Sequence, residues 1–310
     1  MANLKDIKNR IQSIESTKKI TRAMKMVAAA KVKKSETAVK VSRPYTRELV
    51  AMFQKLLNSV TEYSRETLKI KYAIDDYPGL LEIREVKSVG LLVLTSNKGL
   101  AGAYNANVVR ETLKKIKEYQ AQNISVQLLI AGQKGISALR RKCKNLDVPI
   151  VKKYYSAVDT PNAMEAREIA EDMAELYVDK KIDKIEIVTT RFKNMMSYFT
   201  EGWQVLPVVG VVDIHDRITD NVLEPLMEFT PDRHHILQKI VPMYMTNIFY
   251  QALLEAQASE LASRMTAMSA ATTNAEKMIH DLSIEYNKVR QTAITQEIIE
   301  VVSGANSQIG

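Results

Sequence analysis

Cysteine is almost absent from this sequence of 310 residues. Its one cysteine, Cys143, excludes an internal disulfide and a dithiol switch, because either would need a second thiol in the chain. The plain interpretation of Cys143 is a small filler residue on a helix. With 46% apolar and 26% charged residues, the composition is that of a protein with one sizeable domain and room for an extended element.

Long apolar runs are also missing. The run at residues 205–212 is interrupted by Pro207 and Gly210 and is far too short to span a membrane. The start of the chain lacks the apolar core of a signal peptide, and the acidic Asp6 and Glu15 argue against a transit peptide. We therefore expect the mature protein to stay in the compartment where it is made.

Glycine and proline are absent from residues 243–303, which predicts one helix of about 90 Å that ends at Gly304. Alternating steps of four and three residues from Leu254 select one helix face, and only Thr272 on that face is polar. A seven-residue repeat held this long implies a partner helix wound left-handedly against it. The face consists of Leu254, Ala258, Leu261, Met265, Met268, Thr272, Ala275, Ile279, Leu282, Tyr286, Val289 and Ala293.

The first 43 residues also lack glycine and proline and predict a second long helix, with Pro44 restarting or kinking it before residues 45–63. Its apolar stripe shifts from Leu4, Ile7, Ile11 and Ile14 to Ile20, Met24 and Val27, which indicates a change of supercoil or of partner. Residues 1–43 contain twelve Lys or Arg and only three acidic residues. Such an excess fits a solvated face, a nucleic-acid footprint or a surface for an acidic protein.

The middle of the chain alternates between strand and helix patterns. Helical stretches separate the predicted strands, so a βαβ sheet with helices on its faces is expected. We predict strands at residues 88–95, 126–131, 150–155 and 184–190, and further extended structure at 196–212. The predicted organisation is an N-terminal coiled-coil helix (1–60), a connecting segment (61–85), an α/β domain (86–230) and a C-terminal coiled-coil helix (231–310).

Motifs for chemistry are missing. The loop at residues 96–105 follows a strand and precedes a helix, but it contains neither G-x-G-x-x-G nor G-x-x-x-x-G-K-[ST], and the second candidate, residues 132–135, is weaker. The histidines have no metal-ligand spacing, and no nucleophile and base form a set. We predict no catalytic residue, no cofactor and no metal site. The histidines are His215, His234, His235 and His280.

Three stretches resemble one family, the gamma subunits of the F-type ATP synthase. Residues 294–305 match the family signature I-T-x-E-x-x-E-x-x-x-G-A at every fixed position, and residues 18–31 look like its N-terminal helix. The loop at residues 96–102 resembles S-D-[RK]-G-L-C-G but departs from it at Asn97 and Ala101. The dithiol-bearing insertion of the chloroplast members is absent, so the resemblance is to the bacterial type.

The resemblance implies a fold and a role. The terminal helices would form an antiparallel coiled coil, which serves as the rotor shaft inside a ring of alpha and beta subunits. A central Rossmann-like open sheet would form a foot with the epsilon subunit on the membrane c-ring. The chain would then be a non-catalytic subunit, peripheral to the cytoplasmic face of the bacterial plasma membrane. Two other hypotheses are a basic coiled-coil protein that binds nucleic acid and a Rossmann-type enzyme.

The resemblance also implies contact residues. Rotor–stator contacts are expected at Lys18, Lys19, Arg22, Met24, Lys25, Arg264, Arg290, Gln291, Thr295 and Glu297. Foot contacts are expected at Lys98, Gly99, Gly102 and Tyr104, with residues 198–206 close by. An apolar tip should turn in an apolar sleeve, where contacts have no preferred direction. The tip consists of Ile298, Ile299, Val301, Val302 and Ile309.

Overall fold

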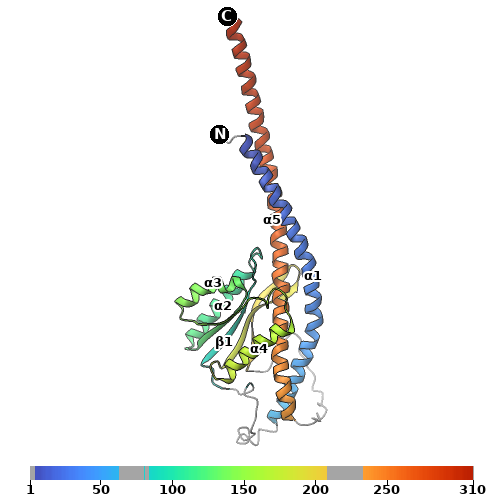
Figure 1. Cartoon of the computed structure of the whole chain (residues 1–310), viewed down its shortest axis with the longest axis vertical. Coiled ribbons are helices and arrows are strands. Elements are labelled where there is room, and N and C mark those ends of the chain that lie inside the picture. The colour runs from blue at the N-terminus through green and yellow to red at the C-terminus, as the bar shows by residue number, and fades with distance from the viewer. Residues whose placement is uncertain (1–3, 63–79, 81–83, 208–232, 310) are drawn as a thin grey trace. The chain divides into compact units, whose positions relative to one another are not determined.

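The chain divides into two compact units. Unit 1 comprises Met1–Ala30 and Arg264–Gly310, and unit 2 comprises Lys31–Ser263. Both units contain parts of the two terminal helices, α1 (Leu4–Glu62) and α5 (Arg233–Ile309) (Figure 1). The computed structural model describes residues 4–62, 80, 84–207 and 233–309.

Unit 2 is built on a five-stranded sheet with the order β3-β2-β1-β4-β5. The first four strands are parallel to their neighbours, and β5 runs antiparallel to β4 at one edge. The strands expected from the sequence are confirmed, although β4 extends four residues further than predicted. The strands are β1 (Ser88–Leu94), β2 (Ser125–Ala131), β3 (Ile150–Tyr154), β4 (Lys184–Asn194) and β5 (Ser197–Leu206).

Helices cover both faces of the sheet. Alternate residues of β1 point to opposite faces, so Val89, Leu91 and Val93 pack with α2 and α3 while Leu92 and Leu94 pack with α4, α1 and α5. All seven residues of β1 are buried, as is typical of a parallel strand with helices on both sides. The helices of the domain are α2 (Tyr104–Ala121), α3 (Gln133–Asn145) and α4 (Ala163–Val178).

In unit 1, α1 and α5 lie side by side and run in opposite directions. The hydroxyl oxygens of Thr21 and Thr272 are 2.9 Å apart, and Nζ of Lys18 lies 3.1 Å from Oε1 of Glu276. The lower-numbered residue of α1 thus pairs with the higher-numbered residue of α5. This antiparallel arrangement confirms the predicted coiled coil.

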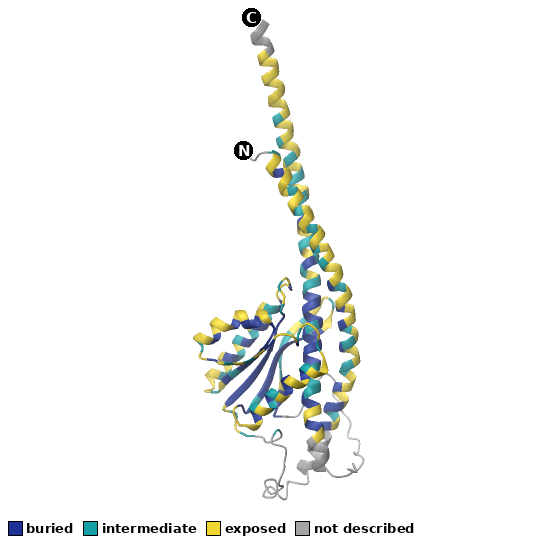
Figure 2. Cartoon of the chain, in the orientation of Figure 1, coloured by how far each residue is buried: buried dark blue, intermediate teal, exposed yellow. Residues whose placement is uncertain are grey.

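The apolar face predicted for α5 is confirmed along its whole length. Each of its positions from Leu254 to Ala293 is buried or half-buried. Most residues of α5 outside that face are exposed after Thr272 (Figure 2). On α1, Ile7 is 3% exposed, whereas Ile20 and Val27 of the shifted stripe are 61% and 56% exposed. Ile20 and Val27 of the shifted stripe therefore face away from α5, whereas Met24 is half-buried.

Of the two effects expected of Pro44, a restart of the helix does not occur, because α1 continues through it to Glu62. An interior proline costs about 3 kcal/mol, and burial of Leu49, Val50 and Phe53 just beyond it offsets this cost at about 1.5–3 kcal/mol per side chain.

Gly304 does not end α5, which continues to Ile309. A helix stop at glycine needs a left-handed backbone, and without one a helical glycine costs only about 1 kcal/mol. The helix also begins earlier than residue 243, at Arg233, and passes through Pro242. Most of the predicted connecting segment (61–85) lies outside the described residues. The last part of the predicted extended stretch, residues 208–212, also lies outside them.

A buried ion pair fastens the start of β1 to the turn before β4. Nε of Arg84 donates to Oδ1 of Asp183 at 2.5 Å, and the other oxygen accepts the amides of Lys87 at 3.0 Å and Ser88 at 2.9 Å. Burial alone would raise the pKa of Asp183, but Arg84 and the two amides outweigh it and hold this pKa below its usual 3.8. The folded state therefore favours the charged carboxylate.

This pair predicts acid sensitivity. The folded pKa of Asp183 is depressed, so its stabilisation is fully present above the unfolded pKa and is lost as pH falls through the folded pKa. We expect Asp183→Asn to lower the unfolding free energy by roughly 1–3 kcal/mol at neutral pH and by less under acid conditions. Denaturant unfolding of the two proteins at neutral and at acid pH measures this difference in unfolding free energy. Asp179→Asn, which removes the exposed partner of Lys181, should change little. An equal loss at both pH values would contradict the assignment.

Candidate functional site

A row of cations lies on the part of α1 in unit 1. Lys18, Arg22 and Lys25 are spaced by four and three residues and so share one helix face, with Lys19 beside them. Lys19, Arg22 and Lys25 are exposed, whereas Lys18 is half-buried and paired with Glu276. The row therefore keeps most of its charge available to another molecule.

Apolar side chains interleave with these cations. Met24 is half-buried, and Ile20, Met26 and Val27 are all more than half exposed. Exposed apolar groups among unsatisfied cations are typical of a surface that a partner covers. The change of partner that the drifting stripe of α1 indicates is thus supported by the burial pattern.

The expected contacts on α5 do not form one cluster. Arg264 and Arg290 are separated by 26 residues, which corresponds to about 39 Å along one helix. Arg264 is half-buried, whereas Arg290, Gln291 and Glu297 are exposed. The hydroxyl of the exposed Thr295 donates to the carbonyl of Gln291 at 2.9 Å, so its proton is used within the helix. The structure thus places these residues in two groups along α5.

Among the described residues of unit 1, no helix lies beside the last part of α5. From the pairs of Lys18 with Glu276 and Thr21 with Thr272, the antiparallel register puts Leu4 opposite about residue 290. Beyond that point Ile294, Ile298, Ile299, Val301 and Val302 are 48–72% exposed (Figure 2). A ridge of bare isoleucine and valine costs free energy in water, so it calls for a protein sleeve. The side chain of Ile309 lies outside the described residues.

The loop between β1 and α2 is held by its own side chains. Asn105 Oδ1 accepts the amide of Ser96 at 2.9 Å, and Asn105 Nδ2 donates to the Ser96 hydroxyl at 2.8 Å. Leu100 and Gly102 have φ of 64° and 51°, so the loop turns sharply at both residues. Lys98 is exposed, Gly102 is exposed and Gly99 is half-exposed, so these three expected foot contacts lie at the surface.

Tyr104, the fourth expected foot contact, does not lie at the surface. Its side chain is 1% exposed in the core between β1 and α2, and its hydroxyl lies 3.3 Å from the carbonyl of Leu94. Burial raises the pKa of Tyr104 above its ordinary value. An aromatic ring at the first position of an amphipathic helix packs inward, so Tyr104 cannot present its side chain to a partner.

The first turn of α3, at the same edge of the sheet, offers no free backbone amides to bind a phosphate. The first-turn amides of α3 all have protein acceptors: Gln133 donates to Asn97 Oδ1, Lys134 to the carbonyl of Ser96, and Gly135 to Thr95 Oγ1. Phosphate loops work because such amides are free. This geometry argues against a nucleotide site at residues 96–105 and 132–135. Cys143 lies in the apolar core, where burial raises the pKa of its thiol to about 11, and so it fits its predicted filler role.

Sequence reasoning missed an ion pair that joins three elements and whose carboxylate is buried. Arg43 of α1 donates to both carboxylate oxygens of Glu255 on α5, at 2.7 and 2.8 Å, and also to the carbonyl of Phe192 on β4. Glu255 accepts the Phe192 amide at 2.7 Å and the Gln251 side chain at 2.9 Å. The hydrogen bond that Arg43 donates to Glu255 is the main reason why the pKa of Arg43 is raised. The available signal was a lone glutamate among apolar neighbours.

Within the part of the chain that the structure describes, no set of three metal-ligating side chains comes together. No helix of the described ranges has the length and apolar content needed to cross a membrane.

Comparisons with known proteins agree with one another. A family model described as ATP synthase matches residues 3–307. The ATP synthase gamma chains of Picosynechococcus and of Nostoc are each 38% identical to this chain over 328 aligned positions, which cover 99% of it and 100% and 99% of those relatives. These matches give no support to a nucleic-acid-binding protein.

Solved structures are similar as well. A chain of the central stalk and c-ring of the Tetrahymena thermophila mitochondrial ATP synthase is 28% identical, with a TM-score of 0.59 over 81% of this chain and 99% of that one. A chain of the Euglena gracilis mitochondrial ATP synthase rotor shares the fold at 16% identity, with a TM-score of 0.62 over 94% and 98%. With full-length relatives and an antiparallel pair of terminal helices around an open sheet, the chain belongs to the gamma subunits of the F-type ATP synthase.

Proposed function

We propose that this chain is the central rotor shaft of an F-type ATP synthase and couples ion-driven rotation of a membrane c-ring to ATP synthesis or hydrolysis. The observation that carries the proposal is the end of α5, which continues beyond α1 with its apolar residues exposed. A helix with this surface needs a surrounding sleeve, and a ring of alpha and beta subunits is such a sleeve. Full-length similarity to gamma chains supports the same role.

The shaft acts by being asymmetric. Its cations lie along α1 at Lys19, Arg22 and Lys25, while α5 carries Arg290 and Glu297 further along. Each of three catalytic sites in the ring faces a different side of such a shaft and is biased towards a different conformation by contacts that it does not share. The catalytic groups belong to the ring subunits, so the chain is non-catalytic and transmits torque.

The sheet of unit 2 forms the foot in this proposal. Lys98, Gly99 and Gly102 lie at the surface of a loop braced by Ser96 and Asn105, so they can contact an epsilon subunit and the c-ring without the loop collapsing. Residues 198–206 on the edge strand β5 contribute to the same foot. The chain then lies on the cytoplasmic face of a bacterial plasma membrane and is held there only through its complex.

Site-specific crosslinking tests this assignment. A photo-crosslinking amino acid at Lys98 should react with epsilon or c subunits in the assembled complex, whereas one at Arg290 should react with alpha or beta subunits, because the two residues belong to different contact regions. Mass spectrometry of the crosslinked bands gives the partner. A crosslinker at the exposed Lys144 of α3, which lies in neither region, is the matched control. Crosslinks from Lys98 to catalytic subunits alone would refute the foot, and failure of Arg290 to reach the ring would refute the shaft.

A further inference from the structure

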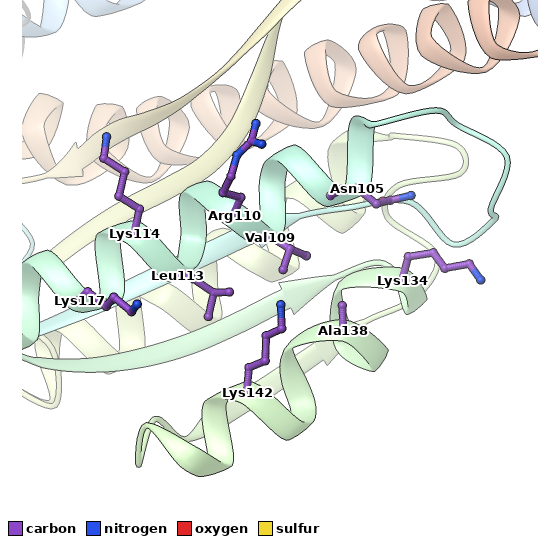
Figure 3. A pocket seen from close by; sticks show the side chains of 10 residues that line it. Asn105, Val109, Arg110, Leu113, Lys114, Lys117, Lys134, Ala138 and Lys142 are labelled. Carbon is purple, nitrogen blue, oxygen red and sulfur yellow. The ribbon is translucent and has the colours of Figure 1, made fainter. Parts of the chain in front are cut away.

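A hollow lies between α2 and α3, and Asn105 at the end of the β1–α2 loop lines one part of it. Its volume is about 790 Å³, and both helices line it (Figure 3). Val109 and Leu113 of α2 point towards α3 and form its floor with the exposed Ala106 and Ala138. Small and branched apolar side chains at the bottom of an open groove favour an apolar occupant.

Cations surround this floor. In the close view Lys142 reaches from α3 towards α2, while Arg110 and Lys114 stand on the other side of α2 (Figure 3). The residues on each helix are three, four or eight apart, which sets them in rows along the groove. The cations of the groove are Arg110, Lys114, Lys117, Lys134 and Lys142.

Most of this charge has no counter-charge among the described residues. No carboxylate of the described residues lies within 4.0 Å of the Nζ of Lys117, Lys134 or Lys142. Lys114 has only two long contacts, 3.7 Å to Glu111 and 3.8 Å to Glu118. Helix α3 has no acidic residue at all. Unpaired cations around an apolar floor therefore call for an occupant that is acidic at its edges and apolar in the middle.

We propose that the groove between α2 and α3 binds an acidic amphipathic helix of a partner protein. The apolar stripe of that helix lies on Val109, Leu113 and Ala138, and its Asp and Glu residues pair with the lysines on both sides. From Ala106 to Lys117 the groove follows α2 for about 16 Å, which equals three turns of a bound helix. Acidic residues four apart on that helix repeat every 6 Å or so, the same spacing as the cations of Arg110 and Lys114.

Other anionic occupants fit less well. A flat membrane surface can reach the outer lysines but cannot reach the floor at Val109, which is only 6% exposed. A free phosphate compound would use backbone amides at the start of α3, and those of Gln133 and Gly135 are already bonded to side chains. The helix uses both the charge and the apolar floor, so it accounts for more of the groove.

Binding to the full-length chain tests the proposal without any other subunit. The probe is a fluorescent peptide of about 14 residues, stapled to hold it helical, with leucines on one face and glutamates on both sides of them. Fluorescence anisotropy should show saturable binding that weakens with salt. A peptide with the same residues in scrambled order should not bind, because its leucines share no face.

Matched charge reversals locate the site. We expect Lys134→Glu with Lys142→Glu to weaken peptide binding by about tenfold or more, because two attractive contacts become repulsive. Arg141→Glu with Lys144→Glu makes the same change of net charge on exposed residues of the same helix outside the groove, and should weaken binding no more than about twofold. Ala138→Glu, which puts a negative side chain on the exposed floor, should also weaken it. Thermal unfolding checks that each variant is folded.

The results of these binding experiments distinguish between the candidate occupants of the groove. No binding of the amphipathic peptide, or equal losses from the groove and control variants, would overturn the proposal. Groove-dependent binding of vesicles of phosphatidylglycerol and phosphatidylcholine without peptide binding would point to a membrane instead, and groove-dependent binding of tripolyphosphate alone would point to a small anion. The proposal goes beyond the rotor assignment, and the assay contains no rotor partner, so its failure would leave that assignment intact.

Discussion

Shortening the chain after Ser303 is expected to leave measurable ion-driven ATP synthesis, whereas reversing the exposed cations Lys19, Arg22 and Lys25 together should lower it far more. The residues around the cut are part of a bare apolar ridge, with Val301 and Val302 72% and 53% exposed. Contacts of such a ridge are dispersive and non-directional, so they guide rotation without preferring one angle. The cut removes only residues 304–310 and leaves this ridge in place, so the shortened chain should keep its guidance and its coupling.

The cations act differently because charge-assisted hydrogen bonds have a direction. Each close pair with a polar or acidic loop of the ring is worth about 1–3 kcal/mol, so three reversals amount to tenfold or more in rate. Lys18 is left unchanged because its pair with Glu276 holds α1 to α5. Directional contacts distinguish one rotary position from the next, and their loss should lower synthesis more than assembly.

The measurement compares rebuilt complexes with equal content of this chain. Ion-driven synthesis is recorded for the truncated chain, for the triple reversal and for a control in which the exposed Lys31, Lys33 and Lys34 of the same helix are reversed. The control makes the same charge change further along α1 and should cost less. If the truncated chain lost all synthesis while the triple reversal kept it, the proposed division between tip and cations would be wrong.

The second large effect concerns stability at Arg43. We expect Arg43→Met to lower the unfolding free energy by about 3 kcal/mol, because it leaves Glu255, whose side chain is 2% exposed, without a cation. We expect a loss at the lower end of the roughly 3–5 kcal/mol that breaking a buried ion pair costs. The reason is that the Phe192 amide and Gln251 still donate to the carboxylate. The pair joins α1, α5 and β4 inside unit 2, so in the rotor assignment it also resists twisting of the helices against the sheet.

A second substitution should recover most of the unfolding free energy that Arg43→Met loses. Adding Glu255→Gln removes the buried charge, and the new amide can donate to Gln251 Oε1 once the Gln251 amide group turns over, since the described residues offer this oxygen no hydrogen-bond partner. Denaturant unfolding of single and double variants measures the recovery. Arg47→Met, one turn further along α1 and exposed, should change stability by no more than about 0.5 kcal/mol. A double variant as unstable as Arg43→Met alone would show that the unpaired carboxylate is not the cause.

Much of the fold could be predicted from periodicity. The repeat from Leu254 to Ala293 is a property of one helix, and side chains four and three residues apart share a face whatever they pack against. The strands β1 and β2 are equally clear, because short apolar runs between turn residues are typical of buried strands. The family signature at residues 294–305 indicates the correct family without any knowledge of tertiary contacts.

The sequence by itself thus determined the two long helices, the alternating sheet and the family, since each rests on local patterns. Only the tertiary structure decided that Arg43 pairs with Glu255, 212 residues away, that Tyr104 packs inward, and that α2 and α3 leave a basic groove between them. It also decided that Pro44 and Gly304 stay within helices. Those features depend on which distant side chains meet, and the free energy of their packing outweighs local preferences that the sequence alone can register.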